Sequence, residues 1–439
     1  MKKNGSTLIN GKFFQNTGWI VGERVFQMSL SIIVGMLTAR YLGPSDFGII
    51  NYTASFTAFF TSICSLGLEG VIVKELVEDP EEEGRIIGTG IAMRLISSLL
   101  SMVAILISIS ILNSNNNVIL IVAMIQSIAL IFRAFELIEF WYQSQLQSKY
   151  STLIKSVSYL IMSSYKVILL LLGKSVEWFA FSTVVDVIII MILYIISYYK
   201  QGGKKLKVSY NLAIKMLSQS YPFILSGIMV ALYVQMDKIM IGQFLNQEKV
   251  GLYTVAATIC GFWVFIPTAF INSARPLIMN LKNENEEQYL MRLKQLYAFI
   301  IWLGIIFALV VTIFSKWIVL ILYGQAYIGS TTTLIISVWS SILSVLGSAR
   351  TIWILCEKYN KYIPKYLIWG IVISVMLNVY LIPKIGIEGA AIAQLTAQIV
   401  TNLIAPLFYN ETRIHTKYIM EAFLLRGVKI NMKGFIRNS

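Results

Sequence analysis

The chain alternates between long apolar runs and short polar linkers. Helices of this length cross about 30 Å of hydrocarbon at about 1.5 Å per residue. The linkers contain Gly, Pro, Asn or Asp, which end regular helices. The pattern predicts an all-α polytopic membrane protein of about 12 transmembrane helices, at residues 17–39, 46–67, 86–111, 118–139, 150–172, 177–199, 217–242, 249–272, 295–320, 326–350, 361–383 and 387–409.

Composition supports this membrane class. Of the 439 residues, 57% are hydrophobic and only 13% are charged, which is about half the charged share of soluble domains. The mean hydropathy is +0.72. A soluble chain of this length would need more polar residues to cover its core.

The distribution of Lys and Arg indicates how the chain is oriented in the membrane. The net charge is +14, and most cations fall between the apolar runs. With the N-terminus inside, about 26 Lys and Arg lie in inside segments and about 4 in outside linkers, the asymmetry that marks cytoplasmic loops. Both termini are therefore predicted to face the cytoplasm. Nucleic acid is not an expected partner, because basic patches interleaved with aromatic residues are absent.

The chain contains a weak internal repeat. YLGPSDFGIINYTASF at 41–56 aligns with FLNQEKVGLYTVAATI at 244–259, and KSVEWFA at 174–180 aligns with IGIEGAA at 385–391. Six spans separate the halves, so both begin on the same side of the membrane, as in a parallel repeat. The predicted organisation is an N-terminal six-helix lobe (1–199), a basic linker (200–216), a C-terminal six-helix lobe (217–410) and a basic tail (411–439). Chance similarity between two hairpins is the alternative.

Enzymatic signatures are missing from the sequence. Cys64, Cys260 and Cys356 lie far apart, without the spacing of metal ligands or a disulfide framework. His415, the single histidine, is in the predicted tail. No linker is long enough to form a separate catalytic domain, so we predict neither catalytic residues, nor a metal site, nor an enzyme.

Ionisable residues inside spans are costly and are expected to face a cavity or a charged partner. Cations there can attract phosphate, and arginine can bind it in bidentate fashion. Five cations are therefore predicted to line a substrate cavity: Arg24, Arg94, Arg133, Lys166 and Lys238. Four carboxylates are predicted as charge partners or coupling sites for H⁺ or Na⁺: Glu23, Glu136, Asp186 and Asp237.

Structural roles remain open for several of these residues. Arg94 lies near the end of its span, where a side chain can extend to the interface. Arg133 and Glu136 share a helix face and could form a buried pair. The acidic run EDPEEEGR at 78–85 is interpreted as a solvated linker and helix start, and the tail as an interfacial helix or a frayed end.

Three segments together resemble the polysaccharide-biosynthesis branch of the multidrug/oligosaccharidyl-lipid/polysaccharide exporter superfamily. They are ARYLGPSDFGIINY at 39–52, YVQMDKIMIGQFLNQEKVGLYTVA at 233–256 and IPKIGIEGAAIA at 382–393. The resemblance implies two six-helix lobes around a cation-lined cavity. It carries a cavity role to Arg24 and, less directly, to Lys238.

The resemblance also implies a function. Undecaprenyl-pyrophosphate-linked oligosaccharides would be flipped from the cytoplasmic to the outer leaflet of a bacterial inner membrane, for O-antigen, capsule or other surface polysaccharide. Transport would be coupled to H⁺ or Na⁺. Expected partners are membrane lipids, the polysaccharide polymerase and the chain-length machinery. The alternatives are a multidrug or toxin exporter of the same fold, or a membrane polymerase or glycosyltransferase.

Overall fold

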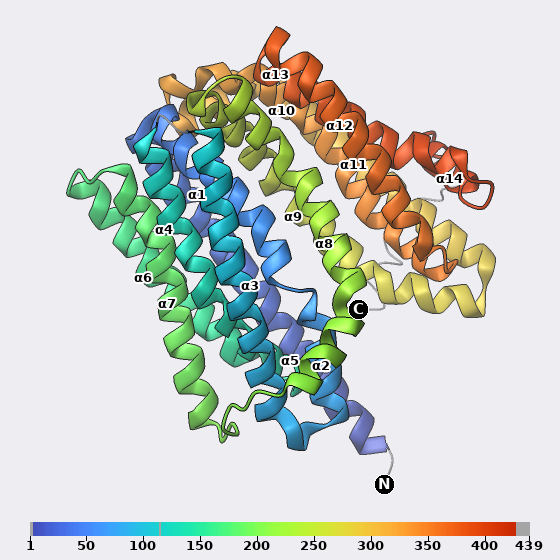
Figure 1. The fold of residues 1–439 in the computed structure, drawn as a ribbon. Coiled ribbons are helices and arrows are strands. Elements are labelled where there is room, and N and C mark those ends of the chain that lie inside the picture. The colour runs from blue at the N-terminus through green and yellow to red at the C-terminus, as the bar shows by residue number, and fades with distance from the viewer. Residues whose placement is uncertain (1–2, 114–115, 427–439) are drawn as a thin grey trace. The chain divides into compact units, whose positions relative to one another are not determined.

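The computed structural model describes residues 3–113 and 116–426, without the side chains of 3–21 and 23–25. Every regular element within these ranges is helical, which confirms the all-α class. Figure 1 shows the helices α1 (Lys3–Cys64), α2 (Leu68–Glu78), α3 (Glu83–Leu112), α4 (Asn117–Arg133), α5 (Ile138–Ser144), α6 (Ser148–Leu171), α7 (Val176–Lys200), α8 (Tyr210–Phe244), α9 (Gln247–Glu284), α10 (Glu286–Tyr323), α11 (Thr331–Cys356), α12 (Ile363–Ile385), α13 (Ile387–Ile399) and α14 (Arg413–Phe423).

The number of spans agrees with the sequence prediction. Eleven segments of the described chain are long and apolar enough to cross a membrane. The first of them, Phe26–Glu78, covers the second predicted span and most of the first, because α1 is two helices joined at a kink. Gly43 adopts a left-handed φ of 70° at that kink, and Pro44 follows it. Glycine tolerates this φ and proline lacks a backbone donor, so the Gly-Pro pair ends the first span.

The chain divides into two compact units, residues 1–231 and 232–439, with the boundary inside α8. In unit 1, α1 packs on α3, α4 and α6, and α7 packs on α4 and α6. In unit 2, α11 packs on α9, α10 and α13, while α12 packs on α13 and α14 packs on α10. In the second aligned pair of segments, each segment contains the start of a helix, since Ser175 precedes α7 and Gly386 precedes α13.

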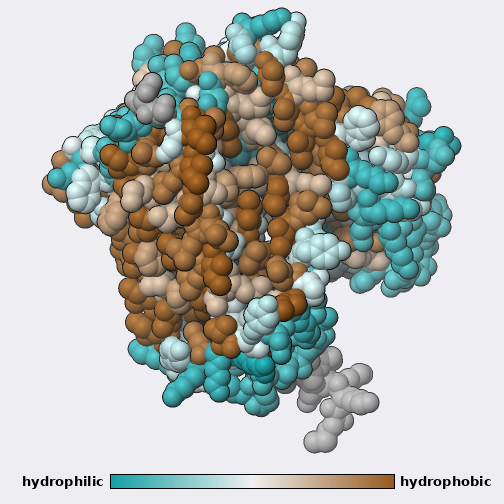
Figure 2. Space-filling view, in the orientation of Figure 1, coloured by the Kyte–Doolittle hydropathy of each residue, from teal (hydrophilic) through white to brown (hydrophobic). Residues whose placement is uncertain are grey.

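The surface is apolar over much of its area. Figure 2 shows hydrophobic side chains over the helices of unit 1, with hydrophilic residues gathered toward the helix ends. Leu171 and Ile111 are 82% and 75% exposed. Apolar patches of this extent are typical of a surface that faces lipid. Together with the apolar helices, they identify a multi-pass membrane protein.

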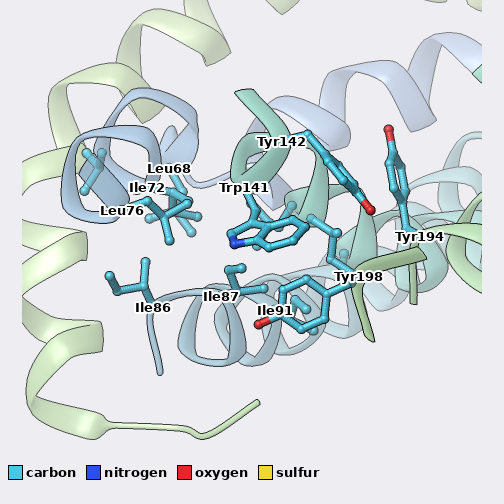
Figure 3. Close-up of a cluster of buried hydrophobic side chains, with 14 of the residues drawn as sticks. Leu68, Ile72, Leu76, Ile86, Ile87, Ile91, Trp141, Tyr142, Tyr194 and Tyr198 are labelled. Carbon is cyan, nitrogen blue, oxygen red and sulfur yellow. The ribbon is translucent and has the colours of Figure 1, made fainter. Parts of the chain in front are cut away.

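A cluster of buried aromatic and aliphatic side chains lies within unit 1 (Figure 3). Trp141 lies with its ring centroid 4.9 Å from that of Tyr198 and is surrounded by Ile72, Ile87 and Tyr142. The rings come from α5 and α7, and the isoleucines come from α2 and α3. The cluster therefore joins helices that are distant in sequence.

The basic linker between α7 and α8 packs against α3 within unit 1. We call residues 201–209 the strap. The Lys207 amide donates to the Gly84 carbonyl at 3.0 Å, and the Ser209 amide donates to Thr89 Oγ1 at 3.0 Å. A side chain on Gly84 or Gly88 would collide with the strap backbone, so glycine permits the close approach.

The acidic run at 78–85 is largely exposed and contains the start of α3 at Glu83, as expected, and it also binds this strap. Glu83 accepts the Lys204 amide at 2.9 Å with one oxygen and the Trp141 indole at 2.7 Å with the other. Glu81 pairs with the Lys204 ammonium at 2.6 Å, and this hydrogen bond raises the pKa of Lys204. The run thus has a structural role that its composition alone does not indicate.

Candidate ion and substrate sites

Unit 1 contains a cavity of about 220 Å³ between α1, α6 and α7. It brings together two of the predicted site residues, Lys166 and Asp186. The other residues that line it carry hydroxyl groups, one amide, aromatic rings and small or aliphatic side chains. They are Ser31, Val34, Gly35, Thr38, Phe47, Ile50, Asn51, Tyr159, Met162, Ser163, Phe179, Ser182 and Thr183.

The two charges in this cavity are not a closed ion pair. Asp186 Oδ1 accepts a hydrogen bond from Ser158 Oγ at 2.6 Å. Asp186 acts electrostatically on Lys166, but no ion pair shorter than 4 Å joins them within the described chain. Thr38 Oγ1 is buried without a hydrogen-bond partner. The cavity therefore offers an ammonium, a carboxylate and a free hydroxyl to a small polar ligand.

Arg94 is deeply buried in unit 1. Its side chain is 8% exposed, its Nε and Nη2 groups have no hydrogen-bond partner, and its guanidinium lies 5.9 Å from the Phe140 ring centroid. Glu69 and Glu136 act on it electrostatically. A buried guanidinium with free donors remains available to an anion, whereas a guanidinium that reached the interface would be solvated.

Arg133 and Glu136, a possible pair in the sequence, interact electrostatically without direct contact. Helix α4 ends at Arg133, and a 3₁₀ turn over Ala134–Leu137 follows. Arg133 is exposed, and no ion pair shorter than 4 Å links these two described residues. Glu139 pairs instead with Lys155 at 2.6 Å. The side chains of Glu23 and Arg24 lie outside the described part, so their cavity role remains a prediction.

Asp237 is the most enclosed carboxylate among the predicted residues whose side chains the structure describes. On α8, it is 3% exposed in unit 2. Tyr253 Oη on α9 donates to its Oδ2 at 2.7 Å, and Asn378 Nδ2 on α12 donates to its Oδ1 at 2.7 Å. The neighbouring Lys238 is half-buried and has no ion pair shorter than 4 Å in the described structure. These two hydrogen bonds tie three helices to one charge.

Oxygen atoms gather around this carboxylate. Asn378 Oδ1 is buried without a hydrogen-bond partner. Ser374 Oγ, one turn earlier on α12, lies 3.3 Å from Asn378 Nδ2. A carboxylate, an amide oxygen and a hydroxyl are ligands that hard cations prefer. The Asn378 amide presents Nδ2 to the Asp237 carboxylate and leaves its Oδ1 as a free acceptor.

Sequence reasoning missed the neutral partners and one cation. Ser374 and Asn378 are uncharged residues within an apolar run, and their only sequence signal is polarity inside a span. Arg350 is the last residue of the predicted span 326–350, where a cation is expected to face the cytoplasm. In the structure it is 7% exposed, and its Nη1 donates to the Thr401 carbonyl at 2.8 Å. Its place at the end of a predicted span concealed this burial.

Comparisons with known proteins place these sites in context. Residues 13–282 match the family described as polysaccharide biosynthesis protein. The chain is 26% identical over 178 residues to the probable flippase AglR of Haloferax volcanii, which covers 39% of this chain and 37% of that protein. It therefore spans little more than a third of that relative's length.

Two solved structures share the fold. One is the lipid II flippase MurJ in an inward closed conformation, with a TM-score of 0.70, 15% identity and coverage of 92% of this chain and 89% of that one. The other is an inward-facing multidrug resistance MATE family transporter of the MOP superfamily, with a TM-score of 0.61, 12% identity and coverage of 92% and 99%. They confirm the predicted architecture of about twelve helices.

Proposed function

Since the chain belongs to the polysaccharide biosynthesis protein family, we propose that it flips lipid-linked oligosaccharides across a membrane. The cargo would be an undecaprenyl-pyrophosphate-linked repeat unit, moved from the cytoplasmic to the outer leaflet of a bacterial inner membrane. The excess of Lys and Arg in alternate linkers supports an orientation with both termini in the cytoplasm. The polymerase and chain-length machinery would act on the flipped product.

Charges inside the apolar units support an anionic cargo. Arg94 keeps unpartnered donors in unit 1, and Lys166 reaches a cavity without closing an ion pair. Such groups are costly inside a membrane and are expected at substrate or ion pathways. A pyrophosphate supplies acceptors that match these donors. Arg24 and Lys238 would extend the same cationic lining, with Arg133, Glu23 and Glu136 as further candidates.

We propose that cation binding at Asp237 drives the cycle. The observation that carries this proposal is the buried carboxylate beside the unpartnered Asn378 oxygen. When Na⁺ or a proton binds, it neutralises a charge shared by α8, α9 and α12. Alternating access would follow because the cation stabilises one arrangement of these helices over another. Asp186 in the cavity of unit 1 is the second candidate coupling carboxylate.

A reconstituted transport assay tests the proposal. Purified protein in liposomes is given a fluorescent undecaprenyl-pyrophosphate-linked oligosaccharide, and its transfer between leaflets is followed by chemical quenching. We expect transfer above that of protein-free liposomes and a loss of transfer in Arg94→Gln. Lys384→Gln, which removes an exposed cation, is the matched control. Transfer of cationic drugs without transfer of this lipid would favour the multidrug exporter instead.

A further inference from the structure

The polar groups around the cavity in unit 1 match one kind of ligand. Lys166 on α6 and Asp186 on α7 both line this cavity, and no ion pair shorter than 4 Å joins them in the described chain. Asp186 Oδ1 accepts a hydrogen bond from Ser158 Oγ at 2.6 Å, and its other oxygen has no hydrogen-bond partner among the described residues. Thr38 Oγ1 on α1 is buried without a partner. Three helices therefore each present a polar group that is free to bind a ligand.

The opposite charges of this cavity disfavour an ion as its ligand. An anion bound at Lys166 would be repelled by Asp186, and a cation bound at Asp186 would be repelled by Lys166. A neutral ligand avoids both penalties. Its hydroxyl groups can donate to the Asp186 carboxylate and accept hydrogen bonds from Lys166 and Thr38, because a hydroxyl is both a donor and an acceptor. The chemistry of the cavity therefore favours an uncharged molecule with several hydroxyl groups.

The size of the cavity and its aromatic walls fit a single sugar ring. Its volume of about 220 Å³ lies below the roughly 300 Å³ at which sites for drug-sized molecules begin. Phe47 and Phe179 line it, and such rings can pack against the apolar C–H face of a sugar. Tyr41 holds Phe179 in place, with ring centroids 5.7 Å apart, and donates to the Lys174 carbonyl at 3.1 Å. The cavity thus combines an apolar wall with polar groups that can bind hydroxyls.

We propose that this cavity binds one neutral sugar ring of the cargo, with Lys166 and Thr38 as donors and Asp186 as acceptor. This inference rests on the proposed flipping of lipid-linked oligosaccharides. The role of Lys166 narrows from attraction of an anionic cargo to a hydrogen bond with its sugar. Asp186 becomes a sugar-binding group, which leaves Asp237 as the coupling carboxylate. The site gives the protein a preference for lipids that carry sugar over bare undecaprenyl pyrophosphate.

Competition between lipids measures this preference. Flipping of the fluorescent undecaprenyl-pyrophosphate-linked oligosaccharide is inhibited either with an unlabelled copy of that lipid or with undecaprenyl pyrophosphate that carries no sugar. The unlabelled copy should inhibit wild type at about tenfold lower concentration, since a hydrogen bond to a charged group contributes at least about that factor. Gly35 lines the cavity, and a Cβ there meets nothing within 4 Å. Gly35→Leu should therefore fill part of the cavity and make the two lipids inhibit equally.

Thr38→Val separates sugar binding from a structural role, and it decides the question if Gly35→Leu does not fold. Valine has nearly the shape of threonine and removes a buried hydroxyl that has no partner. The melting temperature should therefore equal or exceed that of wild type, while the preference for the sugar-bearing lipid should fall at least about threefold. Gly261→Leu on α9 is the matched control for Gly35→Leu, because Gly261 is exposed and a Cβ there also meets nothing within 4 Å. This control should keep the wild-type preference.

The outcomes distinguish the sugar site from flipping itself. Equal inhibition of wild type by the two unlabelled lipids would overturn the sugar site alone. So would a wild-type preference in Thr38→Val, or a loss of preference there with a lowered melting temperature. If wild type transfers no labelled lipid, the proposed flipping fails and this inference fails with it.

Discussion

Gly88 provides a direct way to release the strap without altering any charge. An alanine Cβ at this position would collide with the Lys207 carbonyl oxygen and lie 2.7 Å from the Lys207 nitrogen. Both are backbone atoms, so the strap must move away from α3. That movement would break the bond from the Lys207 amide to Gly84 and the bond from the Ser209 amide to Thr89.

The expected magnitude follows from these contacts. Overpacking costs about 1 to 3 kcal/mol, and two lost hydrogen bonds cost about 1 kcal/mol each. The higher helix propensity of alanine returns about 1 kcal/mol. We therefore expect Gly88→Ala to destabilise the bound strap by about 2 to 4 kcal/mol.

Amide hydrogen exchange in nanodiscs measures this effect at the strap itself. The Lys207 and Ser209 amides should exchange at least about 30-fold faster in Gly88→Ala, since about 1.4 kcal/mol corresponds to a factor of ten. Gly70→Ala on α2 is the matched control, because a Cβ there meets nothing within 4 Å. Wild-type exchange in Gly88→Ala would refute the close packing of the strap against α3.

Three further predictions concern single side chains. Burial, with the nearby Arg350 charge, lowers the pKa of His415 well below its usual 6.5. The unfolded chain therefore protonates His415 more readily than the folded chain, so the full stability is present above a pH of about 6.5 and decreases at lower pH by up to about 1.4 kcal/mol per pH unit. Thermal melts of His415→Gln should lack this pH dependence. Tyr253→Phe removes one hydrogen bond to Asp237 and should change Na⁺ affinity in binding titrations while lowering stability by only about 1 kcal/mol. In Glu83→Gln, the side chain cannot accept both the Trp141 and the Lys204 hydrogen bonds as a carboxylate does. Denaturation should show a free energy of unfolding lower by about 1 to 3 kcal/mol. Equal stability would mean that Glu83 is not needed to hold the strap.

The sequence predicted the spans well because hydrophobic length is a strong local signal. The break at Gly43 could be predicted for the same reason, since a Gly-Pro pair ends a helix wherever it occurs. Asp237 and Asp186 were identified because a charge inside an apolar run is conspicuous. The cavity around Asp186 also needed Lys166 from another helix, and their proximity follows only from packing.

The failures have physical causes as well. Regular α-helical spacing predicts that Arg133 and Glu136 share a face, but the 3₁₀ turn after Arg133 changes that spacing, and the two charges interact without an ion pair shorter than 4 Å in the described chain. Asn378 is an uncharged residue whose importance appears only when Asp237 is placed beside it. Arg350 looked like a linker cation because the π-turn that binds it lies about fifty residues later in the chain. Long-range partners of this kind are not encoded in local patterns.

The central claim is that cation binding at Asp237 drives oligosaccharide-lipid flipping. The most direct measurement imposes a Na⁺ or proton gradient across proteoliposomes and compares the initial flipping rates of wild type and Asp237→Asn. The account predicts that a gradient of one of these ions accelerates the wild type and leaves the variant at its rate without a gradient. Equal acceleration of both proteins, or of neither, would contradict it.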